Sequence, residues 1–189
     1  MQIGIFGGSF NPVHNGHLAI ARKIVSSGEV DEVWLMVSPL NPFKQHADLL
    51  DDSLRLAMTR KAVEDEPGII CSDYEFNLPR PSYTWHTLQS LKKDFPDHTF
   101  SLIIGADNWC SFTGWRNYED IIREHRIFIY PRTGFSVERE LLPQGVSVVD
   151  MDTIDVSSTE IRRKLHNGED VASLIPEGIS NLMAHYTAD

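Results

Sequence analysis

The chain has 189 residues, of which 41% are hydrophobic and 23% charged, and this suits one globular domain with a sizeable core. The formal net charge of −10 argues against the basic surface that binds nucleic acid or anionic membranes non-specifically. The two cysteines are isolated, no apolar run reaches membrane-spanning length, and the N-terminus lacks the basic n-region of a signal peptide. We therefore expect a cytoplasmic protein with reduced thiols and with neither membrane nor nucleic acid as a partner.

Strand patterns alternate with helical patterns along the chain. Strands are expected at residues 2–6, 32–38, 69–71, 99–104, 126–130 and 146–149. Helices are expected after Asn15 as N-cap, at 51–63 and 82–91, behind Ser157 and from Pro176. The repeated strand–helix units predict a single-domain α/β fold over 1–189, a Rossmann-like, doubly wound parallel sheet with a small helical segment at about 157–189. In such a fold the ligand crevice lies beyond the carboxyl ends of the strands.

The stretch 4–17, GIFGGSFNPVHNGH, carries the strongest functional signal. Gly7 and Gly8 allow the backbone to approach a ligand closely, and the helix start near His14 and His17 favours an anion. Neither the Walker pattern nor G-x-G-x-x-G is present, and no Cys or His cluster nearby completes a zinc site. The stretch predicts a polyphosphate cradle, although two surface histidines beside a glycine turn would give the same His-x-x-His spacing.

This stretch resembles the G-x-F-D/N-P-x-H-x-G-H signature of the nucleotidyltransferase superfamily, and most closely that of the bacterial nicotinate-mononucleotide adenylyltransferase family. The resemblance implies that His14 and His17 are catalytic and donate hydrogen bonds to phosphate oxygens. It also implies ATP contacts at the start of the motif, namely at Gly7, Gly8, Ser9, Phe10 and His17.

A second motif, VSSTEIR at 156–162, stands near the other end of the chain. Ser157 followed three residues later by Glu160 is a capping box, which by itself predicts only a capped amphipathic helix. The motif also resembles I-S-S-T-x-I-R of the same superfamily, with Val156 in place of isoleucine. The resemblance implies three residues that bind ATP phosphates, the last of them also catalytic: Ser158, Thr159 and Arg162.

Three further segments resemble substrate-binding segments of the family. Lys44 matches a lysine near the phosphates, with Phe43 where histidine is usual, although a lone lysine is ordinarily a solvated charge. The stretch 81–88 resembles P-S-Y-T-x-D-T-L at the pyridine pocket, with His86 in place of aspartate. The segment 105–107 resembles G-A/P-D, which contacts adenosine, and Trp115 matches an aromatic residue that stacks on nicotinate. Core packing would also account for these aromatic residues.

These segments complete the expected site. Lys44 is implied as catalytic, and the implied contacts with the mononucleotide are Lys44, Tyr83, Thr84, Trp85, Asp107 and Trp115. The further implied ATP contacts are Gly105, Asp107 and Arg132.

The resemblance implies that ATP and nicotinate mononucleotide are the substrates and that nicotinate adenine dinucleotide and pyrophosphate are the products, in NAD biosynthesis. Mg²⁺ is expected as cofactor, held mainly by substrate phosphates rather than by a protein metal site. Another superfamily member such as phosphopantetheine adenylyltransferase remains an alternative, as does a nucleotide sensor without turnover. A homo-oligomer is compatible with the sequence.

Overall fold

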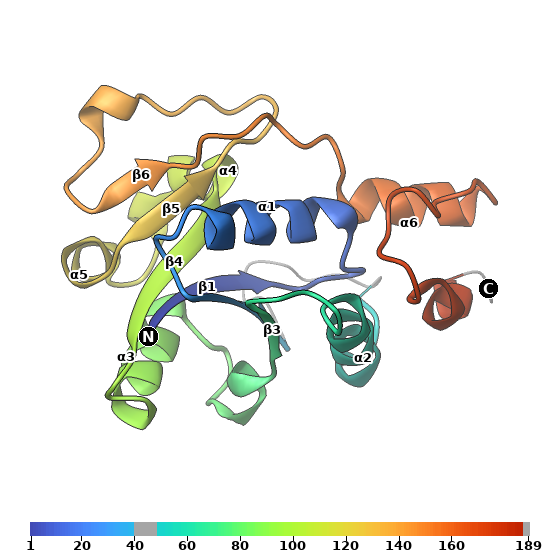
Figure 1. The fold of residues 1–189 in the computed structure, drawn as a ribbon, viewed down its shortest axis with the longest axis horizontal. Helices are drawn as coiled ribbons and strands as arrows, with labels where there is room; N and C mark the ends of the chain where they lie inside the picture. Colours follow the sequence, from blue (N-terminus) through green and yellow to red (C-terminus); the bar gives the residue numbers. More distant parts are fainter. Residues whose placement is uncertain (40–48, 187–189) are drawn as a thin grey trace.

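The computed structural model describes residues 1–39 and 49–186, which form a parallel six-stranded sheet covered by helices on both faces (Figure 1). The strand order is β3-β2-β1-β4-β5-β6. The strands are β1 (Gln2–Gly8), β2 (Glu32–Val37), β3 (Ile69–Ser72), β4 (Thr99–Gly105), β5 (Ile127–Tyr130) and β6 (Val146–Val148). The order of the strands reverses between β1 and β4, and such a switch point is where α/β sheets bind ligands. The doubly wound parallel sheet expected from the sequence is confirmed.

The helices follow the strands in alternation. The α-helices are α1 (Asn15–Ser26), α2 (Asp52–Ala62), α3 (Thr84–Asp94), α4 (Ala106–Cys110), α5 (Tyr118–Glu124) and α6 (Ser158–His166). Short 3-10 helices are η1 (Tyr74–Asn77), η2 (Phe112–Gly114), η3 (Arg139–Leu141) and η4 (Ser180–Tyr186). No helix in the described part of the chain is both long and apolar enough to cross a membrane.

Two buried clusters lie on opposite faces of the sheet. Successive strand residues point to opposite faces, and in β4 Ile103 belongs to one cluster while Leu102 and Ile104 belong to the other. Leu18 of α1 packs in the first cluster, and Leu88 of α3 packs in the second. The sheet is therefore buried on both sides, which accounts for the nearly continuous apolar strands.

Two helix starts differ from the sequence expectation. The N-cap of α1 is His14 rather than Asn15, because Asn15 docks the C-terminal segment: its backbone N–H donates to the Leu174 carbonyl at 2.9 Å and its side chain to the Ser173 carbonyl at 3.0 Å. Pro176 does not open a helix. Gly178 takes the left-handed φ of +89°, which interrupts helical geometry, and η4 begins only at Ser180.

Candidate active site

Two neighbouring cavities lie at the carboxyl end of β1. The larger has a volume of about 560 Å³ and is lined by both histidines of the first motif and by the start of α6. The smaller, of about 160 Å³, lies between α3 and the segment around Trp115. The two cavities share six lining residues: Phe6, Gly7, Gly8, Ser9, Asn108 and Tyr130. Ligands in the two cavities would therefore meet over Gly7 and Gly8, the last two residues of β1, and Ser9 after them. We refer to these three residues as the glycine turn.

The glycine turn is shaped by close packing on one side and open space on the other. A Cβ on Gly8 would lie 3.1 Å from the ring of Phe10, whereas a Cβ on Gly7 would meet nothing within 4 Å. Phe10 is 2% exposed and takes a left-handed φ of 44°. The Phe10 ring thus packs against the buried side of this segment. The backbone of Gly7, Gly8 and Ser9 lines both cavities.

The two histidines stack on each other at the start of α1. Their ring centroids are 3.6 Å apart, and the His14 backbone N–H donates to His17 Nδ1 at 3.2 Å. Phe6 and Phe10 pack edge-on against the His17 ring, so this ring is half-buried instead of projecting freely from the helix end. Since Nδ1 accepts a hydrogen bond, neutral His17 carries its proton on Nε2.

Both imidazoles are neutral at pH 7. Burial lowers the pKa of His14 to about 3, and the positive charge of Arg132 adds to this effect. Burial also holds the pKa of His17 well below its ordinary value, with His14 and Arg132 adding to the shift. The pair can therefore donate hydrogen bonds to a phosphate without carrying charge.

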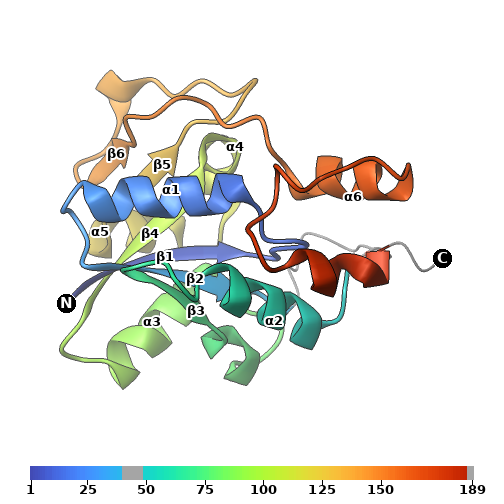
Figure 2. The ribbon, with the colours of Figure 1, turned by 45° about the vertical axis from the view of Figure 1, so that its right-hand side comes forward.

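The second motif docks directly on the first. The Ser158 hydroxyl donates to the Pro12 carbonyl at 2.9 Å, and Arg162 Nη1 donates to the Asn11 carbonyl at 2.8 Å. Helix α6 consequently lies past the strand ends, beside the N-terminus of α1 (Figure 2). Ser157 is the N-cap of α6 and accepts from the Glu160 N–H, which is one half of the expected capping box; the Glu160 carboxylate pairs with Arg163 instead. Ser158, Thr159 and Arg162 all line the larger cavity.

Asp107 and Arg132 form the opposite wall of the larger cavity. Arg132 Nε lies 3.6 Å from Asp107 Oδ1, and neither atom makes a hydrogen bond to the described residues. A Cβ on Gly105 would lie 2.2 Å from Asp107 Oδ1, so only glycine permits this carboxylate position. The family resemblance implies contacts of Asp107 with both substrates, but Asp107 lines only the larger cavity. Gly105, which is implied as an ATP contact, lines neither cavity.

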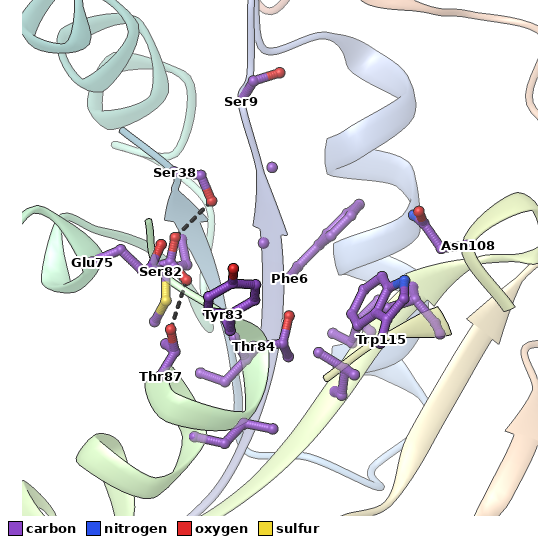
Figure 3. Close-up of a pocket in the computed structure, with 18 of the residues that line it drawn as sticks. Phe6, Ser9, Ser38, Glu75, Ser82, Tyr83, Thr84, Thr87, Asn108 and Trp115 are labelled. Carbon is purple, nitrogen blue, oxygen red and sulfur yellow. Dashed lines mark hydrogen bonds between the residues drawn. The ribbon is translucent and has the colours of Figure 1, made fainter. Parts of the chain in front are cut away.

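The smaller cavity is bounded by aromatic residues on two sides (Figure 3). Tyr83 and Thr84 line it from the start of α3, and Trp115 lines the side opposite Tyr83. Its volume is close to that of an engineered cavity that binds benzene, so it suits one six-membered ring. Trp85 does not line it. That side chain packs partly buried against the second core cluster, because the helix turns it away from the cavity.

Lys44 lies outside the described residues, as does most of the loop 38–45 that was expected around it. The loop begins at Ser38, which lines the smaller cavity.

Sequence reasoning missed a buried carboxylate in the smaller cavity. Glu75 is 8% exposed; it accepts from the Ser38 hydroxyl at 2.6 Å and from the Thr87 hydroxyl at 2.9 Å (Figure 3). The bonds tie the end of β2 to α3 and so hold two walls of the cavity together. Glu75 lies in η1, outside any periodic pattern, and nothing in the sequence pattern marked it.

A buried arginine was also missed. Arg55 is fully buried in α2 and donates to the carbonyls of Ser9 at 2.5 Å, Ser38 at 2.9 Å and Leu50 at 3.1 Å. It thereby joins the glycine turn to the segments on either side of 40–48. The sequence does hold a signal for its burial: Arg55 stands three residues before Met58, which places it on the apolar face of the expected helix.

The described residues contain no group of three or more His, Cys, Asp or Glu side chains that could hold a metal ion. Asp107 is the one carboxylate among the site residues expected from the sequence, and it lines the larger cavity.

The chain is similar to proteins of known families over most of its length. The model of the cytidylyltransferase-like family matches residues 5–164. A Bacteroides fragilis protein named "Probable nicotinate-nucleotide adenylyltransferase" is 51% identical over 170 residues, covering 90% of this chain and 85% of that protein. A Flavobacterium johnsoniae protein with the same name is 42% identical over 187 residues, covering 98% and 97%.

The fold also matches a solved structure. Nicotinic acid mononucleotide adenylyltransferase of Plasmodium falciparum, complexed with NaAD, aligns with a TM-score of 0.83 at 21% identity, covering 99% of this chain and 96% of that one. At this identity the match supports the fold. The sequence matches go further, and the chain belongs to the cytidylyltransferase-like family and, within it, to the nicotinate-nucleotide adenylyltransferases.

Proposed function

We propose that the chain transfers the adenylyl group of ATP to nicotinate mononucleotide, giving nicotinate adenine dinucleotide and pyrophosphate, a step of NAD biosynthesis. The observation that carries this proposal is the pair of cavities that meet at the glycine turn. The larger one falls within the ordinary range for a nucleotide-sized ligand, and the smaller one suits a pyridine ring. We treat residues 1–189 as one nucleotidyltransferase domain.

ATP is assigned to the larger cavity. Its triphosphate would lie over Gly7, Gly8 and Ser9, between the histidine pair and the start of α6. The positive end of the α6 dipole and the Arg162 guanidinium favour an anion there. The remaining assigned contacts of ATP are Phe10, Asp107, Arg132, Ser158 and Thr159, all of which line this cavity. Gly105 lines neither cavity, so its role is limited to leaving room for the Asp107 carboxylate.

Nicotinate mononucleotide is assigned to the smaller cavity. Its ring would stack on Trp115, with Tyr83 and Thr84 opposite and its phosphate directed toward the glycine turn. Asp107 and Lys44 are retained as contacts from the family resemblance, whereas Trp85 is assigned only an indirect role, since its side chain packs against the core.

The reaction is an in-line displacement at the α-phosphorus of ATP. A phosphate oxygen of the mononucleotide forms the new P–O bond, and the bond from the α-phosphorus to the bridging oxygen of the β-phosphate breaks, so pyrophosphate leaves with that electron pair. The attacking oxygen is already ionised, and no general base is needed. Catalysis then depends on positioning and on stabilising the charge that develops on the phosphate oxygens.

The neutral histidine pair suits that role. His17 carries its proton on Nε2 and can donate it as a hydrogen bond, and it does so from a ring fixed by the His14 backbone and two phenylalanines. A donor held in place before reaction needs no reorganisation as charge builds up. His14 is assigned the same task, and Arg162 and Lys44 are assigned cationic stabilisation.

Mg²⁺ is the proposed cofactor and would neutralise triphosphate charge when bound. Because the described residues lack a protein cluster for a metal, its ligands are assigned mainly to substrate phosphates. Asp107 and Asp155 are the carboxylates among the described residues that line the larger cavity.

Measuring pyrophosphate release tests the proposal. The protein is mixed with ATP, Mg²⁺ and one of three acceptors: nicotinate mononucleotide, nicotinamide mononucleotide or phosphopantetheine. We expect fast release only with the nicotinate compound. Release with phosphopantetheine alone would support the alternative transferase, and release with none of the three would support a nucleotide sensor.

A further inference from the structure

We propose that the Arg116 side chain binds the carboxylate of nicotinate and thereby makes the smaller cavity selective for the acid over the amide. Arg116 is the one cationic side chain among the described residues that line this cavity. The inference rests on the proposed function, because it assigns one substrate to that cavity.

Arg116 has no ionic partner among the described residues of this acidic protein. The chain has 27 acidic residues against 17 lysines and arginines. Most arginines in the described ranges make an ion pair or a hydrogen bond, as Arg22 does with Glu66 and Arg126 with Glu29. Arg116 makes neither within residues 1–39 and 49–186, and its guanidinium lies 5.2 Å from the centre of the Tyr83 ring. A cation left without an anion at a cavity wall is ready to receive one from a ligand.

The backbone turn at residues 115–118 fixes the position from which the Arg116 side chain extends. Residues 115–118 form a turn closed by the Tyr118 N–H and the Trp115 carbonyl at 3.3 Å, and Asn117 takes the left-handed φ of 56° that asparagine tolerates. Trp115 and Tyr118 both pack on the buried ring of Phe112. Arg116 therefore projects from an anchored turn, directly after the tryptophan proposed to stack on the pyridine ring.

The side chain also spans the cavity. It leaves the Trp115 wall and reaches the ring of Tyr83 at the start of α3. A pyridine ring between these walls would place a ring substituent near both the guanidinium and the first N–H groups of α3. No side chain caps these N–H groups in the described structure.

The chemistry of the two pyridine compounds then sets the selectivity. A carboxylate accepts two parallel hydrogen bonds from a guanidinium and neutralises its charge. A carboxamide is neutral and turns an NH₂ toward the same donors, which leaves one of them unpaired. Glu75 is the anion in this cavity, but both its oxygens already accept from Ser38 and Thr87, so it does not compete for Arg116.

The test compares Arg116→Gln and Arg116→Lys with the unmodified protein. Arg139→Gln is the matched control, since Arg139 is exposed, lines neither cavity and makes no described ion pair or hydrogen bond through its side chain. For each protein, kcat and KM are measured with nicotinate mononucleotide and with nicotinamide mononucleotide at saturating ATP. Calorimetric binding of each mononucleotide gives the same comparison without turnover.

We expect Arg116→Gln to lower kcat/KM for the acid by about 10- to 100-fold, mainly through KM, which is the scale of a lost hydrogen bond to a charged group. The values for the amide and for ATP should stay unchanged. Arg116→Lys should lower kcat/KM for the acid by a smaller factor, and Arg139→Gln should leave it unchanged.

Two results would overturn the inference. One is that the ratio of kcat/KM for the acid to kcat/KM for the amide is the same in Arg116→Gln as in the unmodified protein. The other is an equal loss for both compounds, which would assign Arg116 to the ribose or phosphate they share. Failure of the unmodified protein to turn over either mononucleotide would instead overturn the proposed function, so the two failures are distinguishable.

Discussion

At the scale of single residues, the proton on His17 Nε2 is the feature on which the proposed chemistry depends most. His17→Asn keeps an acceptor near Nδ1 for the His14 backbone N–H but removes the Nε2 donor. We expect kcat to fall by about 10² or more, the scale of losing one preorganised donor, with the melting temperature little changed. His17→Gln, which carries a donor near the Nε2 position, should lose less.

The two stacked histidines serve one developing charge, so their effects should not multiply. His14→Ala is expected to lower kcat on the same scale as His17→Ala. The double variant should lose less than the product of the two single effects, as steady-state kinetics on all four proteins would reveal. A fully multiplicative loss would mean that the two rings act on separate groups.

Trp115 offers stacking area to either pyridine compound. Trp115→Ala should weaken binding of both nicotinate and nicotinamide mononucleotides by a similar factor and leave ATP binding nearly intact, as calorimetric titration of each ligand would measure. Loss of ATP binding would move Trp115 to the adenosine side of the site. Its expected effect is thus distinct from that of Arg116, which separates acid from amide.

At the scale of elements, α6 is bound to the first motif through Arg162. Arg162→Lys keeps the charge but cannot both donate to the Asn11 carbonyl and present a fork to phosphate. We expect a higher KM for ATP and a lower kcat in initial-rate measurements. Unchanged kinetics would reduce the segment 156–162 to a capped helix without a role in catalysis.

Arg55 of α2 holds the loops on which the site is built. Arg55→Met would leave several buried carbonyls without a donor, and we expect a loss of about 3 kcal/mol in the free energy of unfolding by urea denaturation, together with lower turnover. Arg60→Met on the same helix is the control, because Arg60 forms an exposed ion pair with Asp73, worth at most about 1 kcal/mol. Equal losses in the two variants would contradict the account of Arg55.

The elements themselves were largely predictable from sequence, because strands buried on both faces and a capped amphipathic helix leave clear local patterns. Ser157 was correctly placed as the N-cap of α6, since its partner Glu160 is three residues away. Asn15 was not an N-cap, because its partners at 173 and 174 are remote in sequence. Likewise, the roles of Glu75 and Arg55 arise from contacts between loops that no periodic pattern records. Trp85 was expected at the pyridine pocket from a motif match alone, whereas its side chain packs against the core.

At the scale of the whole molecule, the neutral histidines make stability depend on pH. The unfolded chain binds a proton at His14 below about pH 6.5, whereas the folded protein does so only near the lowered pKa of about 3. The contribution of neutral His14 is therefore complete above about pH 6.5 and is lost progressively as the pH falls toward 3. Each such histidine contributes a slope of up to about 1.4 kcal/mol per pH unit.

Urea unfolding at pH 7 and pH 5 measures this slope. The unmodified protein should lose more stability over that interval than His14→Asn, whereas the exposed-site control His166→Gln should behave as the unmodified protein does. Equal slopes in all three proteins would contradict the assignment of a neutral, buried His14.

The central claim is that two cavities meeting at Gly7, Gly8 and Ser9 each hold one half of a dinucleotide. A crystal structure with nicotinate adenine dinucleotide bound tests it most directly. We expect the pyridine ring against Trp115, the diphosphate over the glycine turn within hydrogen-bond distance of His17 Nε2, and the adenosine in the larger cavity near α6. Adenine stacked on Trp115, or a diphosphate away from the glycine turn, would contradict the account.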